Sequence, residues 1–260
     1  MTYDLKGKNV LVTGASGGIG AALAEGFAAR GATVGICARR ADRLETVLTR
    51  LREHAPGSRA WTIDLSDIGA LDEFAARADR EMGGIDVLVN NAGIPKRKPV
   101  QVLPAETVDD VMRINYTSPV HLTLALLPGI IERAGRIVFV SSVAARLSPP
   151  AEGAYAATKA AISAWAECMK VDLRDTEVGI HVVYPGVIDT ELFHLPGNDP
   201  LPASGVEMLP VDAMVEPVLG AIEAGTFEVS VPDWFNSVYE GKYKDVEAFL
   251  NGTIAYVRSQ

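Results

Sequence analysis

The stretch LVTGASGGIG, residues 11–20, decides the fold that the sequence predicts. It begins in an apolar run typical of a β-strand and ends in a segment with helical spacing. Glycines fill the turn between the two: Gly14, Gly17, Gly18 and Gly20. Because glycine has no β-carbon, such a turn lets the backbone contact a pyrophosphate. The amino end of the following helix supplies N–H donors and a partial positive charge, so the stretch favours a phosphate-binding turn.

The rest of the chain alternates between short apolar runs and helical segments. We expect strands at 9–13, 33–37, 60–64, 86–90, 136–141, 180–184 and 227–231, and helices at about 18–30, 41–54, 67–82, 104–132, 153–175 and 211–224. Continuously apolar runs are typical of parallel strands buried on both faces. The pattern predicts an α/β fold, a Rossmann-like doubly wound parallel sheet of about seven strands with helices on both faces. No linker or repeat interrupts it, so residues 1–260 are expected to form a single domain.

Two segments depart from this alternation. Residues 190–210 are rich in proline and glycine, and a connection of that length in a compact domain is usually functional or disordered. Its apolar side chains predict a lid over the substrate: Leu192, Phe193, Leu195, Leu201 and Met208. The aromatic-rich segment beyond Pro232 is expected to be a helical cap on the core rather than a partner-binding arm.

Composition and charge disfavour several classes of partner. Of the 260 residues, 48% are apolar and 22% are charged, and the net charge is −9. That charge disfavours binding to nucleic acid and to anionic lipid. The N-terminus lacks the pattern of a signal peptide, no apolar run is long enough for a membrane span, and the histidines show no metal-ligand spacing. We therefore expect a cytoplasmic protein with no metal site and no membrane partner.

Several spaced motifs, taken together, identify a family. The glycine turn reads T-G-x-x-x-G-x-G rather than G-x-G-x-x-G. The motifs that follow it in order are Asp64-Leu65, NNAG at 90–93, Asn115, Ser142, the Tyr155/Lys159 pair and PGVIDT at 185–190. Over about residues 5–190 the sequence resembles the short-chain dehydrogenase/reductases. The resemblance implies an oxidoreductase that acts on CH–OH donors, with hydride transfer between a nicotinamide cofactor and a carbonyl or alcohol substrate.

The resemblance implies a catalytic set of Asn115, Ser142, Tyr155 and Lys159. Tyr155 and Lys159 stand four residues apart and share one face of a helix. An ammonium about 4 Å from the phenol, at an effective dielectric of ~20, stabilises the phenolate by roughly 4 kcal/mol. We therefore expect Lys159 to lower the pKa of Tyr155, the proton donor.

The other members of the set take supporting roles. Side chains alternate along a strand, so only one of Ser141 and Ser142 can face the crevice, and we expect Ser142 to polarise the substrate carbonyl. By resemblance, Lys159 also holds the nicotinamide ribose. Asn115 is expected to kink its helix and hold a water that connects Lys159 to solvent.

The residues at the end of the second strand predict the choice of cofactor, because side chains at this position contact the 2′-hydroxyl or 2′-phosphate of the adenosine ribose. NAD-using relatives place an acid at the position of Ala38, and here Arg39 and Arg40 follow instead. A guanidinium binds phosphate through two charged hydrogen bonds, so we predict NADP(H) rather than NAD(H), with Arg39 as the main contact. In the alternative, both arginines are solvated residues at a helix start that pair with Asp42 or Glu45.

Asp64 is expected by resemblance to accept a hydrogen bond from the adenine amino group; the alternative is a helix cap. Ile188 and Thr190 are expected to contact the nicotinamide carboxamide. The full set of expected cofactor contacts is Gly14, Ser16, Gly18, Ile19, Gly20, Arg39, Arg40, Asp64, Leu65, Asn91, Ala92, Gly93, Tyr155, Lys159, Pro185, Gly186, Ile188 and Thr190.

The sequence thus predicts an NADP(H)-dependent oxidoreductase for a small, hydrophobic carbonyl or alcohol substrate. It is expected to form a homodimer or homotetramer through the small-residue face of the Tyr155 helix. Two alternatives stay open. A 3-oxoacyl-(acyl-carrier-protein) reductase-like enzyme would need a basic docking patch, which only Lys96–Lys98 offers. A non-catalytic dinucleotide-binding regulatory protein would be expected to lack the proton donor.

Overall fold

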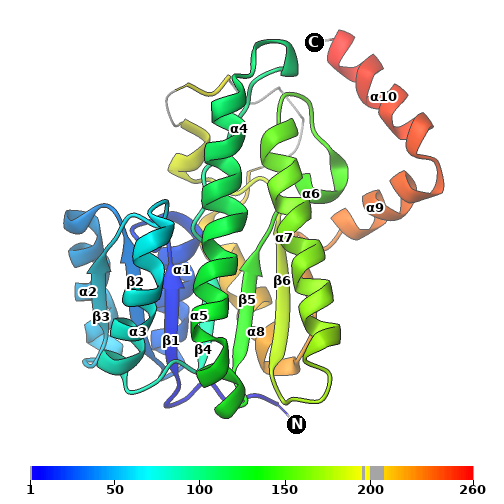
Figure 1. Cartoon of the computed structure of the whole chain (residues 1–260). Coiled ribbons are helices and arrows are strands. Elements are labelled where there is room, and N and C mark those ends of the chain that lie inside the picture. Colours follow the sequence, from blue (N-terminus) through cyan, green and yellow to red (C-terminus); the bar gives the residue numbers. More distant parts are fainter. Residues whose placement is uncertain (1, 195–196, 200–207, 260) are drawn as a thin grey trace.

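The computed structural model describes residues 2–194, 197–199 and 208–259. In this part of the chain one sheet has the strand order β3-β2-β1-β4-β5-β6-β7, and all neighbouring strands pair in parallel (Figure 1). The strands are β1 (Asn9–Thr13), β2 (Thr33–Ala38), β3 (Arg59–Thr62), β4 (Val87–Asn90), β5 (Arg136–Val140), β6 (Gly179–Pro185) and β7 (Glu228–Val231). The predicted doubly wound sheet is confirmed. The strand order reverses between β1 and β4, and this is the place where such sheets open a ligand crevice.

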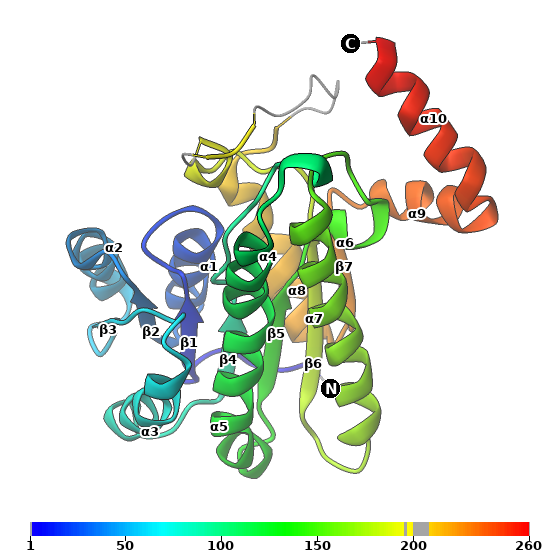
Figure 2. The ribbon, with the colours of Figure 1, turned by 45° about the horizontal axis from the view of Figure 1, so that its top comes forward.

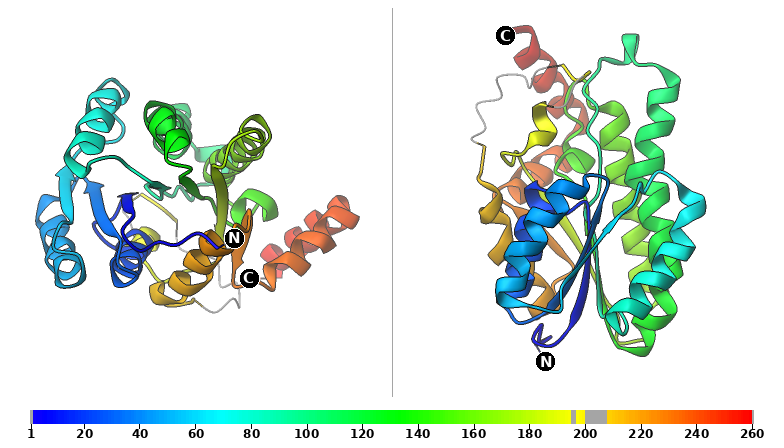
Figure 3. Two further views of the ribbon diagram at one scale, coloured as in Figure 1. Left: turned by 90° about the horizontal axis from the view of Figure 1, so that it is seen from below. Right: turned by 90° about the vertical axis from the view of Figure 1, so that its left-hand side faces the viewer.

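Helices cover both faces of the sheet (Figure 3, right). One face packs against α1 (Gly18–Ala29), α2 (Ala41–His54) and α8 (Val215–Ala224), and the other against α3 (Leu71–Met82), α5 (Ser118–Glu132) and α7 (Gly153–Asp172). Successive residues of β1 serve opposite faces: Val10 and Val12 belong to the first core and Leu11 to the second. This is why the strand sequences are apolar throughout instead of alternating.

The helix predicted over 104–132 is interrupted. It consists of α4 (Ala105–Met112), a π-helical turn, η3 (Arg113–Thr117), and α5. The interruption surrounds Asn115, whose side chain bonds to the backbone of a neighbouring loop. Single π turns of this kind occur mostly at functional positions.

Short turns complete the part of the chain described here. They are η1 (Ile68–Ala70), η2 (Val100–Val102), α6 (Ala144–Leu147), η4 (Glu191–His194) and η5 (Val211–Met214). The predicted lid over 190–210 lies only partly within the described residues. Leu195 and Leu201 fall outside them, whereas Leu209 forms a bridge to Ile188.

The expectation that the C-terminal segment caps the core is correct for α9 (Phe235–Lys244) and wrong for α10 (Val246–Ser259). In α9, Phe235 and Tyr239 are buried. None of the described side chains of α10 is buried, and the helix projects from the body of the molecule (Figure 2). Its apolar side chains have helical spacing, but the turn after α9 directs the helix away from the sheet.

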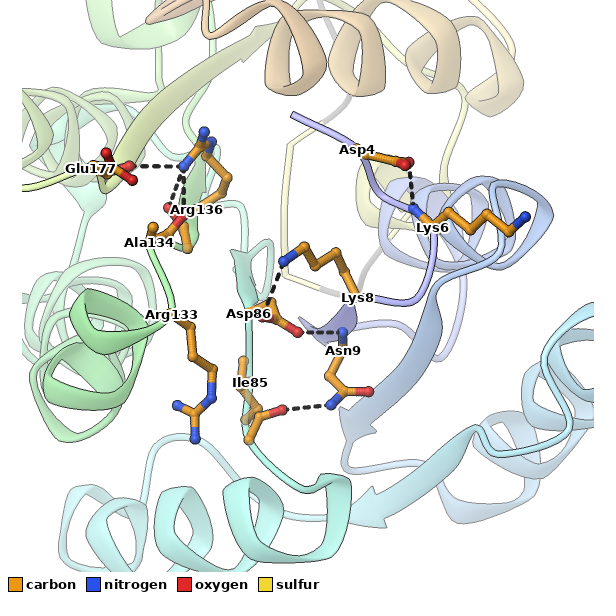
Figure 4. Close-up of polar contacts among 12 residues, drawn as sticks. Asp4, Lys6, Lys8, Asn9, Ile85, Asp86, Arg133, Ala134, Arg136 and Glu177 are labelled. Atoms are coloured by element: carbon orange, nitrogen blue, oxygen red, sulfur yellow. Dashed lines mark hydrogen bonds and ion pairs between the residues drawn. The ribbon is translucent and has the colours of Figure 1, made fainter. Parts of the chain in front are cut away.

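Polar contacts close the amino edge of the sheet (Figure 4). The carboxylate of Asp86 accepts a hydrogen bond from the backbone N–H of Asn9 (2.8 Å) and lies 3.6 Å from the ammonium of Lys8. The Arg136 guanidinium donates to the main-chain oxygen of Glu177 at 3.0 Å. These contacts tie the loops together at this edge, and the cleft described below lies at the opposite, carboxyl edge.

Candidate active site

A cleft of about 590 Å³ lies at the carboxyl edge of the strands. All the predicted cofactor contacts line it, together with Ser142. Asn115 is the exception among the predicted residues: it is 2% exposed and lies behind the wall of the cleft. Positions spread over most of the sequence therefore meet in one place, because the carboxyl ends of parallel strands share an edge.

The glycine turn is shaped by close backbone contacts. Gly14 has a φ of +68°, and a β-carbon there would lie 2.7 Å from the Cα of Ala92. A β-carbon on Gly20 would lie 2.4 Å from the side-chain nitrogen of Asn91. The loop after β4 is thus in contact with the glycine turn, so neither glycine can carry a side chain without displacing that loop.

Thr13 locks these two loops together. Its hydroxyl accepts hydrogen bonds from the N–H groups of Asn91 and Ala92, both at 3.0 Å, and its main-chain oxygen accepts one from the Asn91 amide at 2.8 Å. The threonine of the T-G-x-x-x-G-x-G motif therefore positions the NNAG segment.

The start of α1 fits the pyrophosphate of a dinucleotide. A β-carbon placed on Gly17, the residue before the helix, would have Arg40 as its nearest neighbour, 3.7 Å away. The first turn of α1 carries no acidic side chain. An open glycine backbone at the positive end of a helix suits an anionic ligand.

At the adenosine end, Arg40 rather than Arg39 is held against the glycine turn. The Arg40 guanidinium donates to the Ser16 hydroxyl (3.0 and 3.2 Å) and pairs with the Glu191 carboxylate at 2.8 Å. Arg43 pairs with the same carboxylate, and the pKa of Glu191 is lowered to about 2, chiefly by Arg43 and then by Arg40. In the alternative interpretation Arg40 would pair with Asp42 or Glu45, but its partner here is Glu191, in the segment after β6.

Asp64 lies in the cleft but caps no helix, because Asp67 precedes η1 and Ala70 precedes α3. The Oδ1 atom of Asp64 accepts hydrogen bonds from the N–H and the hydroxyl of Ser66 at 2.9 and 2.8 Å. These bonds lower the pKa of Asp64, and the charge of Arg39 adds to the effect. Arg39 itself is exposed at the mouth of the cleft.

Tyr155 and Lys159 lie near each other on α7, with the lysine Nζ atom 5.7 Å from the centre of the tyrosine ring. The ammonium donates a hydrogen bond of 2.8 Å to the main-chain oxygen of Val140, and burial lowers the pKa of Lys159 to about 8. The pKa of Tyr155 is raised, mainly by burial and further by Glu152, although a hydrogen bond with Ser142 opposes the rise. The expectation that Lys159 lowers this pKa is wrong for this structure, because the cost of burying a phenolate is the larger effect.

The two adjacent serines point in different directions, as predicted. The Ser141 hydroxyl lies 2.9 Å from both the main-chain oxygen of Lys159 and the hydroxyl of Ser163, on the side of α7. The Ser142 hydroxyl accepts a hydrogen bond from the N–H of Ala144 at 3.1 Å. The phenol of Tyr155 lies close enough for Ser142 to oppose the rise in its pKa, so a carbonyl oxygen between the two groups would contact both.

Asn115 holds the loop after β4 in place. Its side-chain oxygen accepts from the N–H of Ile94 at 2.8 Å, and its amide donates to the Ile94 oxygen at 3.0 Å and to the Thr158 hydroxyl at 3.1 Å. The Thr158 hydroxyl donates in turn to the main-chain oxygen of Tyr155 at 2.7 Å. Thr158 is therefore a positioning residue that links Asn115 to the backbone of Tyr155.

Comparison with known proteins agrees with this geometry. The sequence profile described as "short chain dehydrogenase" matches residues 8–199, which is most of the chain. The chain belongs to the short-chain dehydrogenase family. The family's members are oxidoreductases, and the chain's Rossmann-like sheet is the nucleotide-binding fold that they share.

Relatives extend the comparison to individual short-chain dehydrogenases. "Dehydrogenase/reductase SDR family member 7B" of Rattus norvegicus is 37% identical, in a match covering 72% of this chain and 60% of that protein. The chain spans about three fifths of the length of the curated relatives it matches.

Two solved structures show which cofactors such folds carry. A short-chain dehydrogenase from Sphingobium yanoikuyae in complex with NADPH is 28% identical, with a TM-score of 0.77 over 92% of this chain and 95% of that chain. A Burkholderia phymatum short-chain dehydrogenase/reductase in complex with NAD is 23% identical, with a TM-score of 0.83 over 95% of this chain and 96% of that chain, and it supports the fold alone.

The substrate end of this short-chain dehydrogenase contains residues that sequence reasoning missed. Arg97, which the sequence offered only as part of the basic segment Lys96–Lys98, is 2% exposed and lines the cleft. Glu152 and three residues of α10, Thr253, Tyr256 and Val257, line it as well. The spacing of Glu152, three residues before Tyr155, is the signal that could have identified it, because such residues are neighbours at a helix start.

Two further features complete the description of the short-chain dehydrogenase. Among the described residues, no helix combines the length and apolar character needed to cross a membrane. Within the same residues, no three His, Cys, Asp or Glu side chains gather as metal ligands.

Proposed function

We propose that this chain is an NADP(H)-dependent oxidoreductase that interconverts a ketone or aldehyde with an alcohol. The observation that carries the proposal is the close placement of Ser142 and Tyr155 at the wall of a nucleotide-type cleft, with Lys159 beside them. Two hydroxyl groups that share one position can hold a carbonyl oxygen between them.

The residues divide the work of carbonyl reduction. When bound, a nicotinamide dinucleotide supplies the hydride. Ser142 orients and polarises the carbonyl, and Tyr155 holds the proton on its phenol oxygen. Because burial raises its pKa, Tyr155 is protonated at neutral pH and is ready to donate. Lys159, with a pKa of about 8, bears a proton for much of the time at that pH and can help to restore the charge balance after transfer.

The preference for NADP(H) rests on the charges at the adenosine end. Ala38 stands where an acid would select NAD, and Arg39 and Arg40 both line this part of the cleft. Arg39 is exposed and available to a 2′-phosphate, and Arg40 stands at the glycine turn. The structural relative from Sphingobium yanoikuyae was solved in complex with NADPH, and the two arginines of this chain support the same choice of cofactor.

The preference for a hydrophobic substrate rests on the lining beyond Tyr155. Most of the side chains that border this part are apolar: Ile94, Pro95, Val143, Leu147, Pro149, Pro150, Leu192, Phe235 and Val257. Apolar walls with a few convergent polar groups are typical of small-molecule sites.

The two alternative functions find less support. The basic segment Lys96–Lys98 is an unsuitable docking patch for an acidic carrier protein, because Arg97 is buried and Lys98 pairs with Asp199 at 2.7 Å. A purely regulatory protein would have no need of the Ser142–Tyr155–Lys159 arrangement.

We further propose that the chain is a cytoplasmic homo-oligomer. Ala157, Ala160 and Ala164 form an exposed small-residue face on α7, which allows close approach of a second copy. Light scattering of the purified protein, alone and with Ala160→Arg, tests the assembly; a monomeric wild-type protein would contradict it.

The function is tested by following NADPH absorbance with a panel of ketones. Tyr155→Phe is expected to lower the rate by about 10²–10⁴-fold, since general acid catalysis contributes that much. Tyr243→Phe is the matched control, because Tyr243 is 64% exposed on α9. Full activity in Tyr155→Phe would overturn the assignment.

A further inference from the structure

Glu152 places a carboxylate in the substrate end of the cleft, and no residue that the structure describes donates a hydrogen bond to it. It directly precedes α7, but its side chain makes no capping hydrogen bond to that helix. Only its backbone is engaged: the N–H donates to the oxygen of Pro149 at 3.3 Å, and the oxygen accepts from Ala156 at 2.7 Å. Among the hydrogen bonds and ion pairs between described residues, none reaches its carboxylate.

The surroundings of this carboxylate are apolar. Val143, Leu147, Pro149 and Pro150 line the same part of the cleft. A charged group in such a place is costly unless a donor satisfies it. Burial raises the pKa of Glu152 to about 6, and Arg97 opposes the rise, so the group is mainly ionised at neutral pH.

Arg97 supplies the opposing charge from a fixed position. Its backbone N–H donates to the side-chain oxygen of Asn198 at 2.8 Å, and its Nε donates to the main-chain oxygen of Asp199 at 2.9 Å. The N–H of Asp199 donates back to the Arg97 oxygen at 3.0 Å. The segment 197–199 therefore holds a buried guanidinium at the wall of the substrate end.

We propose that Glu152 is a specificity-determining residue whose carboxylate accepts a hydrogen bond from a hydroxyl group on the substrate. The inference rests on the proposed function and narrows it: the substrate is an apolar carbonyl compound with a hydroxyl near the carbonyl, or the corresponding diol in the oxidative direction. Because Arg97 and Glu152 together are neutral, the site favours a neutral donor over an ammonium group. A substrate carboxylate would be repelled by Glu152.

Three matched probes test the proposal. They are 1-phenyl-1-propanone, 2-hydroxy-1-phenylethanone and 2-amino-1-phenylethanone. These compounds differ only in the group that the α-carbon, next to the carbonyl carbon, carries: methyl, hydroxyl or ammonium. We expect the wild-type protein to prefer the hydroxyl probe over the methyl probe in kcat/KM by about 10–100-fold, the range for a hydrogen bond to a charged group. In Glu152→Leu this ratio is expected to fall to about one, with an intermediate value in Glu152→Gln. Glu167→Gln, which removes the same charge from an exposed position of α7, is expected to keep the wild-type ratio.

Each outcome bears on one proposal. If Glu152→Leu keeps the wild-type ratio of kcat/KM for the hydroxyl probe to kcat/KM for the methyl probe, the proposed role of Glu152 is wrong. A preference for the ammonium probe that depends on Glu152 overturns the assignment of a neutral donor. If NADPH binds and none of the probes is reduced, the proposed function fails instead. In that case, calorimetry measures the dissociation constants of the probes for the NADP⁺ complex of the wild type and of Glu152→Leu. The affinity for the hydroxyl probe relative to the methyl probe then tests the role of Glu152 independently of catalysis.

Discussion

The ammonium of Lys159 is bonded to the end of a strand: its Nζ atom donates to the main-chain oxygen of Val140, the last residue of β5, at 2.8 Å. The lysine is almost fully buried at 5% exposure. This contact holds a positive charge behind Tyr155 and next to Gly93, where a β-carbon would lie 3.4 Å from Nζ. Substitution of Gly93 would therefore crowd the ammonium.

The buried lysine should leave a signature in the dependence of stability on pH. Burial lowers the pKa of Lys159 to about 8, below the unfolded value, so between about pH 8 and 10 the unfolded chain binds more protons than the native protein. Over this window the stability of the wild-type protein is expected to rise relative to Lys159→Met. Urea unfolding of both proteins at pH 7, 8, 9 and 10 measures the difference. A difference that stays constant across the series would contradict a lowered pKa.

Asn115 is predicted to stabilise the loop after β4. Asn115→Ala removes three hydrogen bonds and leaves the backbone N–H and oxygen of Ile94 without these partners. We expect a loss of about 2–4 kcal/mol in the free energy of unfolding, since each unsatisfied group costs roughly 1–3 kcal/mol. Denaturant melts check this. The control is Asn251→Ala, at an exposed position of α10, and an equal loss in both variants would refute a special role for Asn115.

The cofactor preference is predicted to depend on Arg39. Arg39→Ala should raise KM for NADPH by about 10–100-fold, because a charged hydrogen bond is worth roughly 1.5–3 kcal/mol, and leave KM for NADH unchanged. Steady-state kinetics with both cofactors measures the effect. Arg50→Ala is the control, because this exposed arginine pairs with Glu25 away from the cleft. If Arg40→Ala alone affects the NADPH value, the main contact is Arg40.

Helix α10 is predicted to serve the substrate end rather than the stability of the fold. Since none of its described side chains is buried, a chain that ends at Asp245 should unfold within about 0.5 kcal/mol of the full chain, as surface changes usually do. Tyr256 and Val257 line the cleft, so KM for hydrophobic ketones is expected to change while KM for NADPH stays constant. A large drop in the melting temperature of the shortened chain would instead show that α10 stabilises the fold.

Much of the fold follows from local patterns. The run LVT before Gly14 and the helical spacing after it specify a strand, a turn and a helix, and the same alternation recurs along the chain to give the parallel sheet. The predicted cofactor contacts also meet in one cleft, because motifs at strand ends necessarily share the carboxyl edge. The family resemblance predicts a kinked helix at Asn115, but the hydrogen bonds from its side chain to Ile94 were not predictable, since Ile94 belongs to another segment.

The sequence by itself determined the succession of strands and helices along the chain, the family, and the expected cofactor contacts that line the cleft, because these depend on periodicity and on motifs of fixed spacing. Only the tertiary structure decided the electrostatics of the site. The pKa of Tyr155 depends on its burial and on Glu152, the partner of Arg40 is Glu191 from a distant segment, and Arg97 is buried by contacts with residues 198–199. Burial and charge pairing depend on distances between segments that are remote in the chain, which local spacing does not specify.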